Sequence, residues 1–460
     1  MEKRLVYSIM LHKLKEKYIK LTSEKNFAEI LRGSSISFLS KIFNLLMGFV
    51  FSILVTRWYG AEVMGIYSLV TVYMMFAGMV SFLGLNTSIV RMIPEHIAKF
   101  SIFSAERIYY KFFKLVFFLS FVTSIVAYSS VDFIAVNIFK KDFMSFLFAI
   151  ASLFIIPQAF MSLNLQVVRS LKAIKLLATV EIASSICKVI ILIILFYLFN
   201  DKYDSVYALF LSNFIMAIVS FYIVFSLFNS KKKDSIDSTN YYEPTVKYIF
   251  SISLPMFLTS GMIMLILQID TVMLSMYSTL KAVGIYAVIV KLAGLSIFVT
   301  ASINTIAGPK ISELFHSGKM DELKNMTQKT TKFAVLITLP IILITIIFGK
   351  YLLSVFGSEF VEGYNTLIIL LSALFISTTA GSEGYFLNMT GHQKVYNYIL
   401  ILSSMLNIGL NYLLIPKYGI EGAAVASLIS KGFWMLIASL YIKRKFNFYI
   451  CYIPFLVGKK

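Results

Sequence analysis

Four basic side chains stand inside otherwise apolar stretches of the sequence and need a chemical reason. They are Lys41, Lys188, Lys291 and Lys431. A lysine at the centre of a membrane helix costs about 2.5–3.5 kcal/mol even on the lower insertion scale, so it is expected to face a cavity or a partner. An ammonium group in such a place offers electrostatic attraction for an anionic ligand.

The strongest of these candidates is Lys41, because it lies on a continuous polar helical face. That face recurs at steps of three or four residues, opposite Phe, Leu and Ile, through Ser37, Lys41, Asn44, Gly48 and Ser52. Around Lys291 the stripe is sparser, with Gly294, Ser302 and Thr305. We expect both lysines to line a cavity; the alternative is that each side chain snorkels to the membrane interface.

The other intramembrane charges have structural alternatives. Lys188 lies two helical turns from Glu181, which predicts a structural ion pair or hydrogen-bonded network, whereas Lys431 stays undecided. Asp270 and Glu383 fall near the predicted ends of spans, where acids are usually caps or interfacial charges. Their use in ion coupling is a second hypothesis.

Metal and redox chemistry find little support in the sequence. Two cysteines fall in apolar segments and four histidines are scattered without ligand spacing, so we expect no metal site and no disulfide. No Walker A pattern occurs, and we expect no cofactor and no enzymatic activity. The net charge of +19 is no sign of nucleic-acid binding. In a membrane protein it is interpreted from the positions of the basic residues along the chain.

The elements that must position these residues are membrane-spanning helices. Of the 460 residues, 58% are apolar and 14% charged, which is typical of a polytopic membrane protein. Apolar runs near the 20 or so residues that a bilayer requires predict an all-α fold of twelve spans, at 34–55, 66–92, 112–129, 142–165, 176–199, 205–228, 246–268, 284–307, 332–349, 363–386, 396–415 and 421–442.

The distribution of lysine and arginine predicts the orientation. If both termini are cytoplasmic, 31 Lys/Arg lie in cytoplasmic segments and seven in external ones, which follows the positive-inside rule. The predicted organisation is a basic cytoplasmic segment (1–33), an N-lobe of six spans (34–228), a linker (229–245), a C-lobe of six spans (246–442) and an interfacial tail (443–460). The first segment also suits a basic helix lying on the cytoplasmic leaflet of a plasma membrane.

An internal repeat relates the two lobes. "EVMGIYSLV" at 62–70 opens the second span and "KAVGIYAVI" at 281–289 opens the eighth, an offset of 219 residues. Six spans per copy give both copies the same orientation, so they are expected to be related by an axis along the membrane normal. Duplication of this kind is typical of transporters, although channels and scaffolds also show it.

The region 33–95 resembles the first two helices of polysaccharide-biosynthesis oligosaccharide flippases, the Wzx-type branch of the multidrug/oligosaccharidyl-lipid/polysaccharide exporter superfamily. Arg57, Gly60, Gly65 and Tyr67 match that family's pattern. Three later segments, 270–295, 309–324 and 387–430, are similar to the family's second half. The resemblance implies a flippase for a polyprenyl-diphosphate-linked oligosaccharide, with membrane lipids and a glycan polymerase or transferase as partners and no nucleic acid.

The resemblance also implies that the first two helices of each lobe line the cavity. On these helices and the link between them, the expected substrate-binding residues are Lys41, Asn44, Arg57, Asn86, Arg91, Gln268, Asp270, Lys291 and Lys310. Two other functions stay open. A cation-coupled multidrug antiporter would need a buried carboxylate in its cavity, and a membrane glycosyltransferase or polymerase would need acids or histidines in a sizeable external loop.

Overall fold

The computed structural model describes residues 25–233 and 243–452, and within these ranges every regular element is a helix. The predicted segments 1–33, 229–245 and 443–460 therefore lie partly outside the described residues. The elements are α2 (Lys25–Phe82), α3 (Leu85–Lys99), α4 (Ile102–Ser129), α5 (Val131–Phe133), the π-helix η1 (Ile134–Ile138), α6 (Met144–Leu153), α7 (Ile155–Ser170), α8 (Ile174–Leu198), α9 (Asp204–Lys233), α10 (Val246–Tyr277), α11 (Leu280–Ala293), α12 (Leu295–His316), α13 (Met320–Ile347), α14 (Gly349–Ser354), the 3-10 helix η2 (Ser358–Gly363), α15 (Tyr364–Ala380), α16 (Glu383–Met389) and α17 (Gln393–Phe446).

Eight helices of the described residues are long and apolar enough to cross a membrane, or nine if α6 and α7, bent by 47°, form one span. Two of them hold two predicted spans each. The α2 and α17 helices pass through non-helical backbone at Gly60 (φ 85°) and Gly419 (φ 53°), close to the predicted links between spans. The pair α11 and α12 covers the predicted span 284–307. The prediction of an all-α polytopic membrane protein is confirmed.

Two predicted span limits differ from the structure. The span 66–92 is interrupted, because Leu83 and Gly84 have positive φ and α3 begins only at Leu85. The seventh span was predicted to end at 268, but α10 continues to Tyr277. The polar Gln268 and Asp270 suggested an exposed helix end, whereas Asp270 is buried among hydrogen-bond donors.

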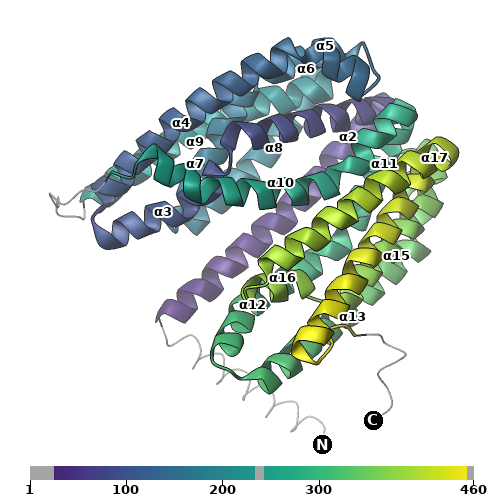
Figure 1. Ribbon diagram of the computed structural model, residues 1–460. Coiled ribbons are helices and arrows are strands. Elements are labelled where there is room, and N and C mark those ends of the chain that lie inside the picture. Colours follow the sequence, from purple (N-terminus) through teal and green to yellow (C-terminus); the bar gives the residue numbers. More distant parts are fainter. Residues whose placement is uncertain (1–24, 234–242, 453–460) are drawn as a thin grey trace, which may run out of the picture.

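The core is shared between the two halves of the chain at one end of the molecule and separate at the other. We call α2–α9 the N-terminal half and α10–α17 the C-terminal half. One hydrophobic cluster contains residues of both halves, among them Phe51, Met64, Val206, Leu274, Ile289 and Leu367. Two further clusters lie almost entirely within one half each. In Figure 1 the halves are close together around α11 and lie apart toward α3 and α12.

The α10 helix connects the halves at the other end. Its first turns pack on the N-terminal half, because Ile249 belongs to that half's cluster and Ser253 Oγ lies 2.7 Å from Ser88 Oγ of α3. Its later turns pack on α17. The predicted boundary at 246 assigns all of α10 to the C-lobe, but the packing of its first turns crosses that boundary.

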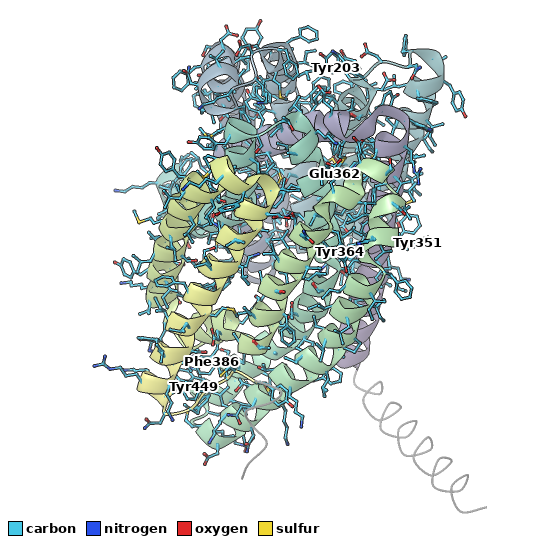
Figure 2. The ribbon with its side chains drawn as sticks, turned by 90° about the vertical axis from the view of Figure 1, so that its right-hand side faces the viewer. Tyr203, Tyr351, Glu362, Tyr364, Phe386 and Tyr449 are labelled. Carbon is cyan, nitrogen blue, oxygen red and sulfur yellow. The ribbon has the colours of Figure 1, made fainter. Side chains whose placement is uncertain are left out.

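The chain after α17 folds back onto the C-terminal half. Phe448 and Ile450 are buried in that half's own cluster, and Gln328 Nε2 donates to the Tyr449 carbonyl at 2.8 Å. Figure 2 shows Phe386 and Tyr449 together at one end of the molecule and Tyr203 at the opposite end. As far as residue 452, then, the predicted interfacial tail packs against protein.

The orientation is open to a direct test with reporter fusions. A reporter fused after residue 235 or 320 is expected to be cytoplasmic, and one fused after residue 137 or 357 external, because the positive-inside rule sets this topology. Alkaline phosphatase and green fluorescent protein fusions in cells measure the two sides. A single reversed reporter contradicts the twelve-span arrangement.

Candidate functional site

The Lys291 ammonium group bridges the two halves of the chain. From α11 its Nζ donates to the Gly48 carbonyl at 2.8 Å and to Ser52 Oγ at 2.5 Å, both on α2. Among the described residues no carboxylate oxygen lies within the 4.0 Å limit of an ion pair with it. Lys291 is therefore a cation held by neutral acceptors, and it reaches the α2 face that the sequence predicts to be polar.

The other polar residues of that face are used in different ways. Asn44 Oδ1 accepts a hydrogen bond from Ser185 of α8 at 2.7 Å, so Asn44 ties two helices of the N-terminal half together. Lys41 is exposed. It precedes Ser52 by 11 residues, about 16 Å along a helix at 1.5 Å per residue. The structure therefore does not bring Lys41 into contact with Lys291.

The predicted pair of Lys188 and Glu181 does not form. The Lys188 ammonium lies over the Phe51 ring, 4.9 Å from its centre. Glu181 instead accepts a hydrogen bond from Ser40 Oγ at 3.2 Å, and its other oxygen lies 4.0 Å from Arg169. Two helical turns along α8 separate the two side chains, and each finds a nearer partner on α2 or α7.

Arg57, a predicted substrate ligand, instead joins the halves. Its Nε donates to the Val355 carbonyl at 2.7 Å and its Nη2 to the Ser354 carbonyl at 2.8 Å. These carbonyls end α14, where a cation is favourable. In return, Glu359 of η2 accepts from the Ala61 amide at 2.7 Å. Each half thus satisfies a helix end of the other, and we call these contacts the interhalf clasp.

The clasp supplies a hydrogen-bond acceptor at a helix start that has no side-chain cap of its own. In the second copy, Thr279 caps α11 by accepting from the Ala282 amide. The repeat equivalent of Thr279 is Gly60, which has no side chain and a left-handed φ of 85°. Thr279 bonds the third amide of its helix, whose repeat equivalent is Val63, whereas Glu359 bonds the first, that of Ala61, so the carboxylate serves a different amide of the same first turn.

The two glycines of the repeated G-I-Y motif face each other across the halves. A Cβ on Gly65 would lie 2.2 Å from the Leu280 carbonyl oxygen, and one on Gly284 would lie 1.9 Å from the Ala61 carbonyl oxygen. The offset of 219 residues relates Gly65 to Gly284 and Ala61 to Leu280, so the same contact is made twice. Small residues permit such close approach of membrane helices.

Removing the arginine of the clasp should loosen this end of the molecule. We expect Arg57→Ala to raise the reactivity of a buried Ala61→Cys thiol by at least about tenfold, because two hydrogen bonds to a charged group are lost. Labelling by a membrane-impermeant maleimide, in a chain without Cys187 and Cys451, measures it. Lys202→Ala serves as a cationic control at the same predicted end. Equal labelling of both variants would contradict a role of Arg57 in closure.

Asp270 is buried in a polar network of the C-terminal half. It accepts hydrogen bonds from Tyr286 (2.9 Å), Asn411 (2.7 Å) and Ser427 (2.5 Å), which come from α11 and α17. It is therefore neither a cap nor an interfacial charge, as the sequence suggested. With these donors on both of its oxygens, Asp270 joins three helices of that half. Its use in ion coupling stays a prediction.

Glu383 is also buried rather than interfacial. Ser439 donates to one of its oxygens, while Oε2 has no partner among the described residues. Lys310 pairs with Glu313 at 2.6 Å on an exposed part of α12. Gln268 and Lys431 are partly buried, on α10 and α17, and the charge of Lys431 interacts with that of Asp270. The described residues hold no group of three acids, histidines or cysteines that a metal would need.

Asn86 and Arg91 line a pocket with two residues that the sequence analysis did not single out. The pocket, of about 360 Å³, lies between α3 and α7 and includes Gln166 and Arg169. Arg169 is one of the 31 basic residues of the predicted cytoplasmic segments, and no periodicity connects positions 91 and 169. Only the packing of α3 on α7 reveals the pair.

Comparisons with known proteins agree on the kind of protein. The family model described as polysaccharide biosynthesis protein matches residues 30–315, and the one described as MatE matches residues 255–413. The capsular polysaccharide biosynthesis protein CapF of Staphylococcus aureus is 28% identical over 264 residues, 56% of this chain and 65% of CapF, just under two thirds of that relative. The probable low-salt glycan biosynthesis flippase Agl15 of Haloferax volcanii is 23% identical over 162 residues, 35% of this chain and 34% of Agl15.

Solved structures share the fold. An inward-facing multidrug resistance MATE family transporter of the MOP superfamily matches with a TM-score of 0.68 at 14% identity, over 86% of this chain and 94% of that one. A MOP superfamily transporter from Pyrococcus furiosus, described as having a binding pocket of reverse polarity, matches with a TM-score of 0.63 at 15% identity, over 91% and 95%. At these identities the likeness establishes the fold alone.

Proposed function

Since this chain belongs to the polysaccharide biosynthesis protein family of MOP superfamily transporters, we propose that it moves a polyprenyl-diphosphate-linked oligosaccharide from the cytoplasmic to the outer leaflet of the plasma membrane. The relatives named above are a capsular polysaccharide biosynthesis protein and a probable glycan biosynthesis flippase, which supports a substrate of this class. A glycan polymerase or transferase that consumes the product is the expected partner.

One observation carries the proposal, namely the Lys291 ammonium group between the halves. An anionic diphosphate cannot enter hydrocarbon unless protein groups replace its water. Lys291 is bonded to a carbonyl and a hydroxyl rather than a carboxylate. Its positive charge is therefore not neutralised by a described acid and remains available to a phosphate, which makes stronger charge-assisted bonds than either neutral acceptor.

The distribution of the core supports movement by alternating access. One hydrophobic cluster joins the halves at the predicted external end, while the clusters at the other end are nearly separate. Apart from the first turns of α10, which pack on the N-terminal half, the halves share a core at one end, and two such halves can exchange the end at which they meet. This arrangement corresponds to a state whose substrate path opens toward the cytoplasm.

The second candidate function is a cation-coupled multidrug antiporter. The buried carboxylates of Asp270 and Glu383 favour it, because a drug pump needs acids to bind cations. Both acids, however, accept hydrogen bonds from neighbours within the C-terminal half. The contact between the halves carries a lysine, which favours an anionic substrate.

A proteoliposome assay separates these functions. The purified chain is reconstituted with a fluorescent polyprenyl-diphosphate oligosaccharide, and the fraction that is accessible to an impermeant quencher is followed with time. We expect the chain to accelerate transfer between leaflets and to leave the efflux of a cationic dye unchanged. Dye efflux without lipid transfer would support the antiporter, and cleavage or extension of the glycan would support the enzyme alternative.

A further inference from the structure

A cationic pocket and an apolar groove lie close to each other on the N-terminal half. The pocket, between α3 and α7, presents two guanidinium groups and two amide side chains, from Arg91, Arg169, Asn86 and Gln166. Both arginines are exposed; Arg169 lies in the last turn of α7, and Arg91 lies near the middle of α3, at the end of the predicted span 66–92. The positive-inside rule places both arginines on the cytoplasmic side, at the depth of lipid phosphates.

The arginines of the pocket form no hydrogen bond to an acid within the described residues, so they can bind an added anion. Arg169 donates to Gln166 Oε1 at 3.1 Å, and its distance to Glu181 is 4.0 Å, beyond the range of a hydrogen bond. Arg91 has no recorded ion pair among the described residues, because the nearby Glu95 bonds to Lys99 at 2.6 Å. Paired arginines with amide donors suit the oxygens of a phosphate or diphosphate.

The groove lies between the start of α2 and the start of α8. It has a volume of about 550 Å³ and is lined mostly by apolar side chains, including Leu39 and Leu46 of α2 and Ala178 and Ile182 of α8. Leu39 and Leu46 are 65% and 54% exposed, so the groove is open to the surroundings of the helix. Lys175 provides a positive charge at its margin.

A single carboxylate connects the two sites. Glu181 lies 4.0 Å from Arg169, which lines the pocket, and accepts a hydrogen bond at 3.2 Å from Ser40, which lines the groove. A lipid with an anionic head and a long chain matches this order of charge and apolar surface. A free phosphate ion would leave the groove without an occupant.

We infer that the pocket and groove together form a reception site for the lipid-linked diphosphate, which precedes its contact with Lys291. The diphosphate binds Arg91 and Arg169, and the first isoprene units lie in the groove between α2 and α8. This inference rests on the proposed function, since it names the same substrate. It adds a site at the cytoplasmic side that none of the predicted lysines provides.

Binding measurements on the full chain test this site. The protein is placed in nanodiscs of phosphatidylcholine, and native mass spectrometry follows the binding of a polyprenyl diphosphate, the corresponding uncharged polyprenol, and phosphatidylglycerol. The variants are Arg91→Gln and Arg169→Gln for the pocket and Ala178→Phe for the groove. Lys172→Gln is the matched control, because Lys172 is exposed at the same end and lines neither site.

We expect each arginine variant to weaken polyprenyl diphosphate binding about tenfold, since one charge-assisted hydrogen bond is lost, and to leave polyprenol binding unchanged. Ala178→Phe should weaken both ligands, and Lys172→Gln neither. Unchanged diphosphate binding in both arginine variants overturns the site. Equal, arginine-dependent binding of phosphatidylglycerol also overturns it, because the site would then hold a structural phospholipid.

The failure of this inference is distinct from a failure of the proposed function. If the arginine variants bind and transfer the substrate normally, the reception site is wrong while flipping stands. If the unmodified chain transfers no lipid-linked oligosaccharide in proteoliposomes, the proposed function is wrong whatever the nanodiscs show.

Discussion

Replacing Lys291 with alanine is expected to reduce leaflet transfer of the lipid-linked oligosaccharide by about 10- to 150-fold, the range of one hydrogen bond to a charged group. The variant removes the cation that bonds from α11 to α2 within the described part of the chain. Lys291→Arg should retain part of the activity, because it keeps the charge but changes the geometry of its donors. The quencher assay in proteoliposomes gives the rates.

Two matched variants separate charge from packing. Ser52→Ala removes one acceptor of Lys291 but leaves the Gly48 carbonyl, so most of the activity should remain. Lys281→Gln, on the same helix, removes an exposed lysine that pairs with Glu362 at 3.0 Å, and transfer should be unchanged. Normal glycan display by a stably expressed double variant, Lys41→Ala with Lys291→Ala, would contradict the cationic site.

The second large effect is expected from Gly284→Ala. Its Cβ would lie 1.9 Å from the Ala61 carbonyl oxygen, and backbone cannot yield as a flexible side chain does. The α2 and α11 helices must therefore separate, which opens the shared core. We expect a loss of about 1–3 kcal/mol, the usual cost of overpacking, visible as a lower Tm, together with slower lipid transfer.

The same substitution elsewhere provides the control. Gly409 lies in α17 with nothing within 4 Å of the position of a Cβ. Gly409→Ala should be neutral or slightly stabilising, because alanine loses less conformational entropy in a helix than glycine. Gly65→Ala should behave like Gly284→Ala. A Gly284→Ala protein as stable and active as Gly409→Ala would show that the close approach is not needed.

Membrane character and the repeat could be predicted because they depend on periodic, local properties of the chain. Apolar runs of membrane length recur, and the G-I-Y motif recurs after 219 residues. The polar face of the first span is a property of the same kind, and it does meet Lys291 at Gly48 and Ser52.

Pairings between distant segments could not be predicted in this way. Glu359 bonds to Ala61 across 298 residues, and nothing near either residue indicates the other. Asp270 was misplaced for a related reason, since an acid near a predicted helix end suggests exposure until its donors from α17 are known. The sequence shows which side chains need partners, and only the packing of the helices supplies them.

The doubled glycine contact gives the chain the geometry of a two-fold symmetric dimer within one polypeptide. In an isologous interface residue i meets j and j meets i, as Gly65 and Leu280 are repeated by Gly284 and Ala61. A homodimer would have to change both copies of any residue at once. In a single chain that contains both copies, the residues at the axis can stay symmetric while the surrounding residues differ. Lys291 stands in one copy, and the buried Val72 stands at the equivalent position of the other. The symmetric glycine contacts hold the two halves together. The loss of symmetry at positions 72 and 291 allows a single charge on one side of that contact.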